Sequence, residues 1–314
     1  MIQSVSPRVQ PHPGYVPWYR SRSERRELLW ALAFLLPNLL AFVGFTVGPM
    51  LFSLGMTVMD WPLLKPPRFN GTDNFARLVD DDVFWQAFGN TFRYVVMYVP
   101  LVTVCAFFLA VLLDRKLRGI TWYRTVFFLP SVALFVSIAM LWSWLYDPNS
   151  GVINYLVAVL LGVDPPKWLS SPAWALPSIV AMNVWRQAGY YSLIFLAGLQ
   201  SIPDELHEAA EVDGANGLQR LRYLTIPLIF PTTFFVVITS LIAAFQLFGE
   251  AFVMTKGGPG YATTTLVFYV YRMGFESFRM GYAALIAWVL FAVIFVVTLV
   301  QWRFAGERGH GVRD

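Results

Sequence analysis

Residues 280–302 read MGYAALIAWVLFAVIFVVTLVQW, a run that contains no charged residue. An α-helix needs about 20 predominantly apolar residues to cross the hydrocarbon core of a bilayer, because each residue advances the helix by about 1.5 Å. The run reaches this length before the next charge, Arg303. It is therefore expected to form a membrane-spanning helix.

Five other runs of this kind precede it. They are Leu28–Met59, Tyr94–Leu113, Thr125–Tyr146, Trp168–Pro203 and Tyr223–Gly249. Only the fourth contains a charge, which is Arg186. A shorter apolar stretch, Gly257–Tyr271, begins with glycines and a proline and predicts a loop followed by an interfacial or partly inserted helix. We expect an all-α integral membrane protein with six transmembrane helices.

The composition fits a protein that uses lipid as part of its solvent. Of the 314 residues, 57% are hydrophobic and 13% are charged, whereas soluble domains average about 45–50% and about 25%. The net charge of +4 does not indicate nucleic-acid binding, because the basic residues lie in short clusters beside the apolar runs. The single cysteine excludes an internal disulfide, and no Cys/His cluster has the spacing of a metal site.

The N-terminal segment differs from a cleavable secretion signal. Its arginines precede the uncharged stretch Leu28–Met59, which is 32 residues long. A signal peptide would have an apolar stretch of about 7–15 residues and a small-residue cleavage site. We therefore expect residues 1–27 to remain as an N-terminal tail.

The basic residues also predict the orientation in the membrane. Lys and Arg are enriched in short cytoplasmic loops. Fourteen of them lie in the two tails, in Arg115–Arg124 and at Arg220 and Arg222, while seven lie in the opposite loops. Because six spans place both termini on one side, both termini are expected in the cytoplasm.

The segment between the fourth and fifth expected spans is strongly acidic. It reads SIPDELHEAAEVDGANGLQRLRYLTIP over residues 201–227. Ser201 as a capping side chain, Pro203 and the early acids are typical of a helix start. Gly214 permits the left-handed conformation that ends a helix. We predict a short helix, a glycine turn and a second helix that re-enters the membrane. The alternative is an ordinary solvated connection, but the small Ala209-Ala210 pair would allow a partner to approach closely.

The order of residues in this loop resembles the EAA loop of bacterial ABC importer permeases. The family pattern is Glu-Ala-Ala, three residues, Gly, nine residues and Ile-x-Leu-Pro. Here Glu208-Ala-Ala is followed by Gly214 and by Leu224-x-Ile226-Pro227. The resemblance extends from about Leu28 to Phe304 and is closest to the sugar and glycerol-phosphate permeases of the maltose-importer type. Further segments that carry it are Gly89–Thr91, Arg124–Pro130, Ala197–Pro203 and Thr255–Pro259.

This resemblance implies the fold of a type I ABC importer permease in a bacterial or archaeal plasma membrane. It implies three kinds of partner besides the lipid bilayer itself: a second homologous permease, two ABC ATPase subunits and an extracytoplasmic solute-binding protein. The cargo would be a carbohydrate, either a di- or oligosaccharide or a solute like glycerol 3-phosphate. The EAA loop would be a coupling helix that contacts the ATPase through Glu208, Ala209, Ala210, Asp213 and Gly214.

The resemblance also implies domain boundaries and a division of roles between this chain and its partners. Residues 28–304 would form the permease domain, with a core at 86–302 and the coupling loop at 201–225, and residues 305–314 a cytoplasmic tail. The chain has no Gly-x-x-x-x-Gly-Lys-Ser/Thr phosphate loop. We therefore expect a non-catalytic subunit without cofactor or metal, with ATP and Mg²⁺ bound by the partner ATPase.

Polar residues inside the fourth and fifth runs are candidates for a solute path, because ionisable groups at membrane depth are costly and often functional. The candidates are Asn183, Arg186, Gln187 and Tyr190 in the fourth run, Gln246 in the fifth, and Glu250 directly at the end of the fifth. Each set is expected to share one helix face. Arg186 has two interpretations: it contacts the solute, or it pairs with Glu250 or the partner permease to hold helices together. For Glu250 a structural or gating role is favoured, because it lies near the outer end of its span.

The rival class is a self-sufficient secondary transporter or a channel. Such a protein would show inverted repeats between its halves, and these halves show no convincing repeat. It would also have no use for an acidic coupling helix. A membrane-embedded enzyme is favoured even less, because no clustered His, Cys or paired carboxylates lie in the apolar runs.

Overall fold

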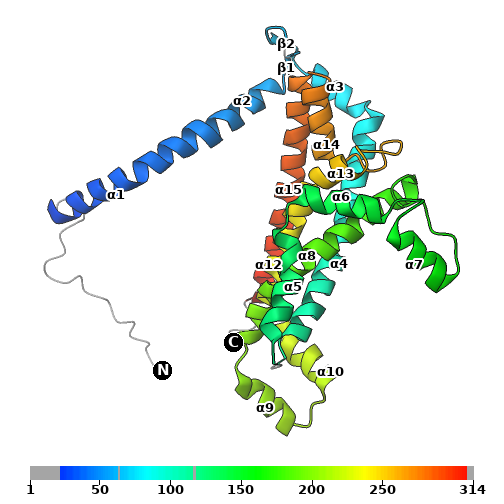
Figure 1. Cartoon of the computed structure of the whole chain (residues 1–314). Helices are drawn as coiled ribbons and strands as arrows, with labels where there is room; N and C mark the ends of the chain where they lie inside the picture. The colour runs from blue at the N-terminus through cyan, green and yellow to red at the C-terminus, as the bar shows by residue number, and fades with distance from the viewer. Residues whose placement is uncertain (1–21, 63, 116–117, 310–314) are drawn as a thin grey trace, which may run out of the picture. The chain divides into compact units, whose positions relative to one another are not determined.

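The structure, a computed structural model, describes residues 22–62, 64–115 and 118–309. It is helical apart from one two-stranded hairpin (Figure 1). The chain divides into two compact units, residues 1–55 and 56–314. Most of the expected N-terminal tail and the last five residues lie outside the described residues.

The first unit is one long apolar helix. It contains α1 (Arg22–Phe42), the π-helical turn η1 (Val43–Val47) and nearly all of α2 (Gly48–Met56). The stretch Arg26–Met56 is long and apolar enough to cross a membrane, and none of its most apolar 18 residues is buried inside the chain.

The second unit holds the remaining elements. In chain order they are β1 (Met59–Asp60), β2 (Arg68–Phe69), α3 (Asp73–Val79), α4 (Asp82–Leu113), α5 (Ile120–Val132), α6 (Phe135–Leu145), α7 (Val152–Leu161), α8 (Pro172–Gln200), α9 (Asp204–Val212), α10 (Gly217–Arg220), η2 (Leu221–Thr225), α11 (Ile226–Leu228), α12 (Phe230–Phe245), α13 (Gly249–Met254), α14 (Leu266–Tyr271), η3 (Arg272–Glu276) and α15 (Met280–Gly309).

The two ends of this unit differ. Figure 1 shows the β1–β2 hairpin and α3 at one end and the pair α9–α10 at the other. The hairpin is antiparallel, with Met59 opposite Phe69 and Asp60 opposite Arg68. The helix α15 runs from the hairpin end toward the α9 end (Figure 1), as expected for a final span that ends on the same side as the acidic loop.

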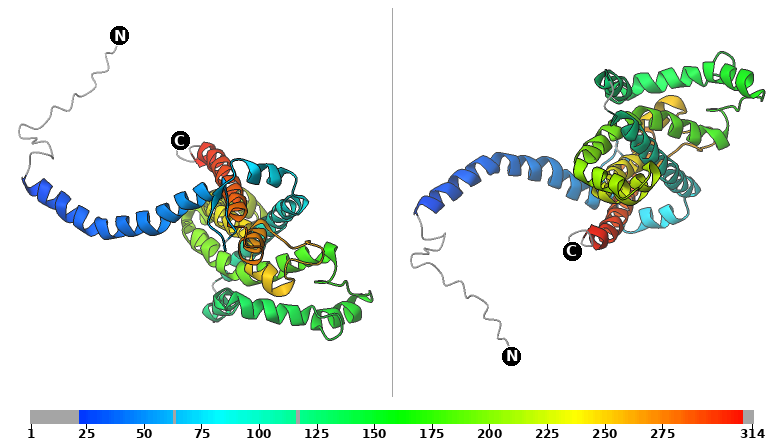
Figure 2. Two further views of the ribbon diagram at one scale, coloured as in Figure 1. Left: turned by 90° about the horizontal axis from the view of Figure 1, so that it is seen from above. Right: turned by 90° about the horizontal axis from the view of Figure 1, so that it is seen from below.

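The core of this unit is built around α4 and α8, which form its most extensive helix pair (Figures 1 and 2). Ala106 and Ala110 on α4 are fully buried, and such small side chains let neighbouring helices approach closely. Gly189 on α8 lies against the backbone of α5. A β-carbon there would come 1.9 Å from the carbonyl oxygen of Phe127, so this crossing requires glycine.

Helices that could cross a membrane match five of the six expected spans in the part of the chain described. Arg26–Met56, Asp82–Leu113 and Met280–Arg303 qualify alone, and two bent pairs qualify if each pair forms one span. The sixth expected span corresponds to α8. Its 29 residues extend about 44 Å, which is long enough, but its central amides and Arg186 lower its mean hydropathy.

Two expected spans are broken, which the apolar runs did not reveal. The run Thr125–Tyr146 becomes α5 and α6, which meet at 95°. The run Tyr223–Gly249 bends by 67° before Phe230, and its helix α12 ends at Phe245. The prediction that Gln246 and Glu250 share one face of one helix is therefore wrong, because Gln246 ends α12 and Glu250 belongs to α13. Hydrophobicity alone carries no signal for such a bend.

The cap predicted for the acidic loop also needs correction. The hydroxyl of Ser201 donates to the carbonyl of Gly198 at 2.7 Å, and Ser201 is the C-cap of α8. The residue before the first turn of α9 is Pro203. Since α8 continues to Gln200, Ser201 is already engaged in ending that helix and cannot cap the next one.

Candidate functional site

The acidic loop has the predicted build of two short helices around a glycine turn. The helix α9 ends in a Schellman-type closure, in which Gly214 adopts φ +76°. The N–H of Gly214 donates to the carbonyl of Glu211 at 3.0 Å, and that of Ala215 to the carbonyl of Ala210 at 2.9 Å. These bonds satisfy carbonyls at the end of α9 and require a residue that tolerates positive φ.

The second helix of the loop has its own cap. The side chain of Asn216 accepts from the N–H of Gln219 at 2.9 Å, and the Gln219 side chain accepts from the N–H of Asn216 at 2.8 Å. This capping box starts α10. An ion pair between Arg220 and Glu211 then joins α10 to α9. The loop is thus a defined structure closed by backbone and side-chain bonds.

The surface of the loop combines acids with exposed apolar side chains. Glu208, Ala209, Asp213 and Gly214 are exposed, and Ala210 is half-buried. The exposed apolar side chains nearby are Leu206, Val212, Leu218 and Tyr223. A hollow of about 350 Å³ lies between the two helices and is lined in part by Ala210, Asp213 and Gly214. The loop thus presents acidic and apolar side chains to its surroundings.

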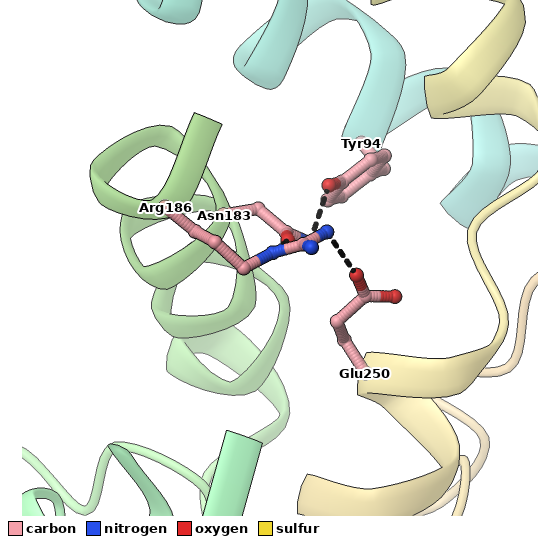
Figure 3. Close-up of polar contacts among 4 residues, drawn as sticks. All are labelled: Tyr94, Asn183, Arg186 and Glu250. Carbon is pink, nitrogen blue, oxygen red and sulfur yellow. Dashed lines mark hydrogen bonds and ion pairs between the residues drawn. The ribbon is translucent and has the colours of Figure 1, made fainter. Parts of the chain in front are cut away.

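The second candidate site is a polar network between α4, α8 and α13 (Figure 3). The amide of Asn183 donates to the hydroxyl of Tyr94 at 2.8 Å, and the Arg186 Nε donates to the Asn183 Oδ1 at 3.4 Å. The Arg186 Nη2 lies 2.9 Å from the Glu250 Oε1, and the two side chains are 14% and 12% exposed. The pairing of Arg186 with Glu250, one of the two interpretations left open by the sequence, is present in the structure.

The other predicted path residues lie outside this network. In the described residues, Gln187 and Tyr190 on α8 and Gln246 after α12 make no hydrogen bond to its four members. Tyr190 and Gln246 are exposed, and Gln187 is half-buried. Trp185 is 45% exposed and packs with its ring 5.5 Å from that of Trp142. The structure therefore separates a buried pairing network from a set of accessible amides and rings.

Tyr94 is the network member that sequence reasoning missed. It is buried and stacks on Tyr98, with ring centroids 5.3 Å apart. The spacing of these two tyrosines by four residues inside an apolar run was a usable signal, because it places two hydroxyls on one helix face. Asn183 is itself 3% exposed, so its loss would leave the Tyr94 hydroxyl without this partner.

A third polar cluster lies at the hairpin end, just before α4. The Asp81 carboxylate caps α4 by accepting from the N–H groups of Val83 and Phe84. It also accepts from the hydroxyls of Tyr269 at 2.5 Å and Tyr282 at 2.6 Å. Burial raises the pKa of Asp81, but these four hydrogen bonds outweigh burial and hold its pKa below the ordinary value. Asp81 thus joins α4, α14 and α15.

The architecture and the acidic loop point to a class of protein. Residues 85–305 match the family described as the binding-protein-dependent transport system inner membrane component, and the chain belongs to this family. The all-α permease fold, the transmembrane helices and the role of an ABC transporter permease are thereby confirmed.

Several relatives cover most of the chain. A probable ABC transporter permease protein of Bacillus subtilis, YesP, is 38% identical over 93% of this chain and 95% of its own. The lactose transport system permease protein LacF of Rhizobium radiobacter is 37% identical over 77% and 82%. The sn-glycerol-3-phosphate transport system permease protein UgpA of Escherichia coli is 33% identical over 87% and 92%.

A solved structure shares the fold. It is a chain of a bacterial alginate ABC transporter in complex with a periplasmic protein bound to an alginate pentasaccharide. The similarity has a TM-score of 0.78 and 25% sequence identity, and it covers 89% of this chain and 94% of the other. Membrane localisation and the role of a transport permease subunit follow from the family. In the described residues, no cluster of His, Cys, Asp and Glu could hold a metal ion.

Proposed function

We propose that this chain is one of two homologous permeases in an ATP-driven importer that moves a neutral carbohydrate from an extracytoplasmic binding protein into the cytoplasm. Two ATPase subunits would bind ATP and Mg²⁺ and supply the energy. The observation that carries the proposal is the coupling loop: an exposed acidic helix closed by Gly214, with apolar side chains facing outward.

The loop would act as the contact with the ATPase. Glu208, Ala209, Ala210, Asp213 and Gly214 form the contact residues of this proposal. Since the hydrogen bonds around Gly214 and the capping box at Asn216 make the loop rigid, a push on α9 would pass into η2 and α12 rather than dissipate within the loop.

The solute path would run along the accessible polar residues. Gln187 and Gln246 offer amides to sugar hydroxyls, and Trp185 and Tyr190 offer ring faces to the apolar C–H faces of a sugar. Asn183, Arg186 and Glu250 would lie beside this path, with their polar groups engaged mainly in joining α8, α4 and α13. A movement of α13 would then break the Arg186–Glu250 pair and thereby alter the path.

The charge balance favours a neutral carbohydrate over a phosphate ester. Arg186 is the basic residue at the centre of α8, and its guanidinium is already paired with Glu250 at 2.9 Å. A solute phosphate would have to compete with this carboxylate and leave Glu250 as an unpaired charge in a half-buried position, which is costly. Hydroxyl groups need no such exchange.

The orientation proposed here places α9 and both termini in the cytoplasm of a bacterial or archaeal plasma membrane. The bias of Lys and Arg toward that side supports it. The hairpin β1–β2 and the loop before α14 would then face the binding protein.

Purification of the tagged chain from its native membrane tests the assembly. A homologous permease and an ATPase are expected to co-purify, whereas a self-sufficient carrier would be isolated alone. The purified complex is then reconstituted in vesicles with its binding protein, and ATP-dependent uptake of neutral sugars and of glycerol 3-phosphate is compared. Uptake of the phosphate ester with no uptake of any neutral sugar would contradict the proposed substrate class.

A further inference from the structure

A groove follows α4 and α8 away from the polar network. Three adjoining cavities, of about 580, 470 and 160 Å³, share lining residues with one another. Met97 and Pro177 line both the first and the second, and Val104 lines both the second and the third. They therefore form one continuous groove, which we call the α4–α8 groove.

One end of this groove carries a cation. Arg93 lines the first cavity together with Gln86 and is exposed. In the described residues, Arg93 has no ion pair, hydrogen bond or ring contact, and none of the residues that line the groove is acidic. Lysine and arginine near helix ends in membranes extend toward the polar interface. An occupant of this end should therefore carry negative charge.

The same end also offers hydrogen-bond acceptors. Pro100 and Pro177 lie inside α4 and α8, and proline lacks the N–H that would bond the carbonyl four residues earlier. The carbonyls concerned belong to Val96 and Ala173, and both residues line the first cavity. A headgroup that combines an anionic phosphate with hydroxyl donors would satisfy Arg93 and these carbonyls together.

The second cavity is lined only by apolar residues, and the stretch from Arg93 to Val104 has the length of a lipid chain. Arg93 and Val104 are eleven residues apart on α4, which corresponds to about 16 Å along a helix. This is close to half of the roughly 30 Å hydrocarbon core. The part of the groove between Arg93 and Val104 therefore extends from one interface to about the middle of the bilayer, as an acyl chain of one leaflet does.

We infer that the α4–α8 groove binds an anionic phospholipid, with its phosphate at Arg93 and an acyl chain along Met97, Leu101 and Val104. The lipid belongs to the leaflet at the hairpin end, opposite α9. An apolar helix of another chain is the competing occupant, but it would cover Arg93 without neutralising it.

Lipid retention by the assembled transporter tests this inference. The complex is reconstituted in phosphatidylcholine nanodiscs with a minor fraction of phosphatidylglycerol, re-extracted in detergent, and analysed for bound lipid by mass spectrometry. The wild type should retain phosphatidylglycerol preferentially, and Arg93→Gln should lower its retention by about tenfold, as expected for the loss of a charged hydrogen bond. Arg68→Gln is the matched control, because Arg68 is an exposed arginine at the same end of the molecule and outside the groove.

Two further outcomes keep the test decisive. A photo-crosslinking residue at Leu101 should form adducts with lipid, and Ala181→Phe, which narrows the apolar part of the groove, should lower retention without removing any charge. Equal phosphatidylglycerol retention by the wild type and Arg93→Gln would overturn the inference. Crosslinks from Leu101 only to a partner subunit would overturn it as well, since they would identify a protein occupant.

Discussion

Replacement of Glu250 by glutamine should reveal how strongly the ion pair with Arg186 holds α13 against α8. The two side chains are 2.9 Å apart and 14% and 12% exposed. Loss of one partner of a buried pair costs about 3–5 kcal/mol, because the other charge remains unpaired. We expect about 3 kcal/mol, at the lower end of this range, because Arg186 keeps its hydrogen bond to Asn183.

A double-mutant cycle separates the pair from its surroundings. Thermal unfolding of the purified complex is measured for Glu250→Gln, Arg186→Met and the double variant. Because the double variant leaves no unpaired charge, it should be about 2 kcal/mol more stable than the sum of the single changes predicts. The shift in unfolding temperature at constant detergent and protein concentration gives these differences.

The pair Arg272–Glu276 supplies an internal comparison. Its side chains are 30% and 46% exposed and lie 3.2 Å apart, four residues along the chain. Exposed pairs of this kind contribute about 0.3–0.5 kcal/mol. If Glu250→Gln were no more destabilising than Glu276→Gln, or if the effects of Arg186→Met and Glu250→Gln simply added, the pair would not be holding the helices together.

Three other predictions address topology, the solute path and the hairpin end. With the native Cys105 replaced, a cysteine at Asn149 should react with an impermeant maleimide outside intact cells and one at Asn216 should not; the reverse pattern would invert the orientation. Gln187→Ala should slow uptake by up to about tenfold while assembly stays intact, because one hydrogen bond to the solute contributes about 0.5–1.5 kcal/mol. Unchanged uptake would indicate that Gln187 serves only helix packing. The lowered pKa of Asp81 means that its contribution to stability is complete above the unfolded value near 3.9 and is lost as the pH falls through the folded pKa. Asp81→Asn should therefore destabilise the complex at neutral pH and flatten its acid unfolding profile, and an unaltered profile would contradict the role of this carboxylate.

The sequence predicted the helices better than their breaks. Charge-free runs located the spans because lipid tolerates no buried charge without a partner. The 95° bend between α5 and α6 and the end of α12 at Phe245 depend on packing between distant segments, which local hydrophobicity does not record. The error at Glu250 followed from this, since a helical spacing was applied across a helix end.

The coupling loop was predictable because its signals are local. Gly214, the acids of the first turn and the small alanines all act within a few residues of one another, and the structure has the expected helix, turn and helix. The error at Ser201 arose because two helix ends are adjacent there, and Ser201 caps the end of α8 instead of the start of α9. The pairings of Tyr94 with Asn183 and of Asp81 with Tyr269 join residues 89 and 188 positions apart, and one sequence offers no guide to such pairings.

The central claim is that α9 couples the membrane helices to an ATPase, and two glycines of the same loop allow it to be tested with matched variants. Gly214 has φ +76°, and a β-carbon there would meet nothing within 4 Å; Gly217 is equally open but has no positive φ. Aspartate at either position adds the same charge, but only Gly214→Asp strains the backbone, by about 1–2 kcal/mol. The two variants therefore differ in the turn that closes α9 and in little else.

The measurement is ATP hydrolysis by the reconstituted complex with and without loaded binding protein. Gly214→Asp should insert into the membrane normally but either lose the ATPase on purification or hydrolyse ATP without responding to the binding protein. Gly217→Asp should keep most of the stimulated rate. Normal assembly and full stimulation in Gly214→Asp would contradict the account and leave the loop as a solvated connection.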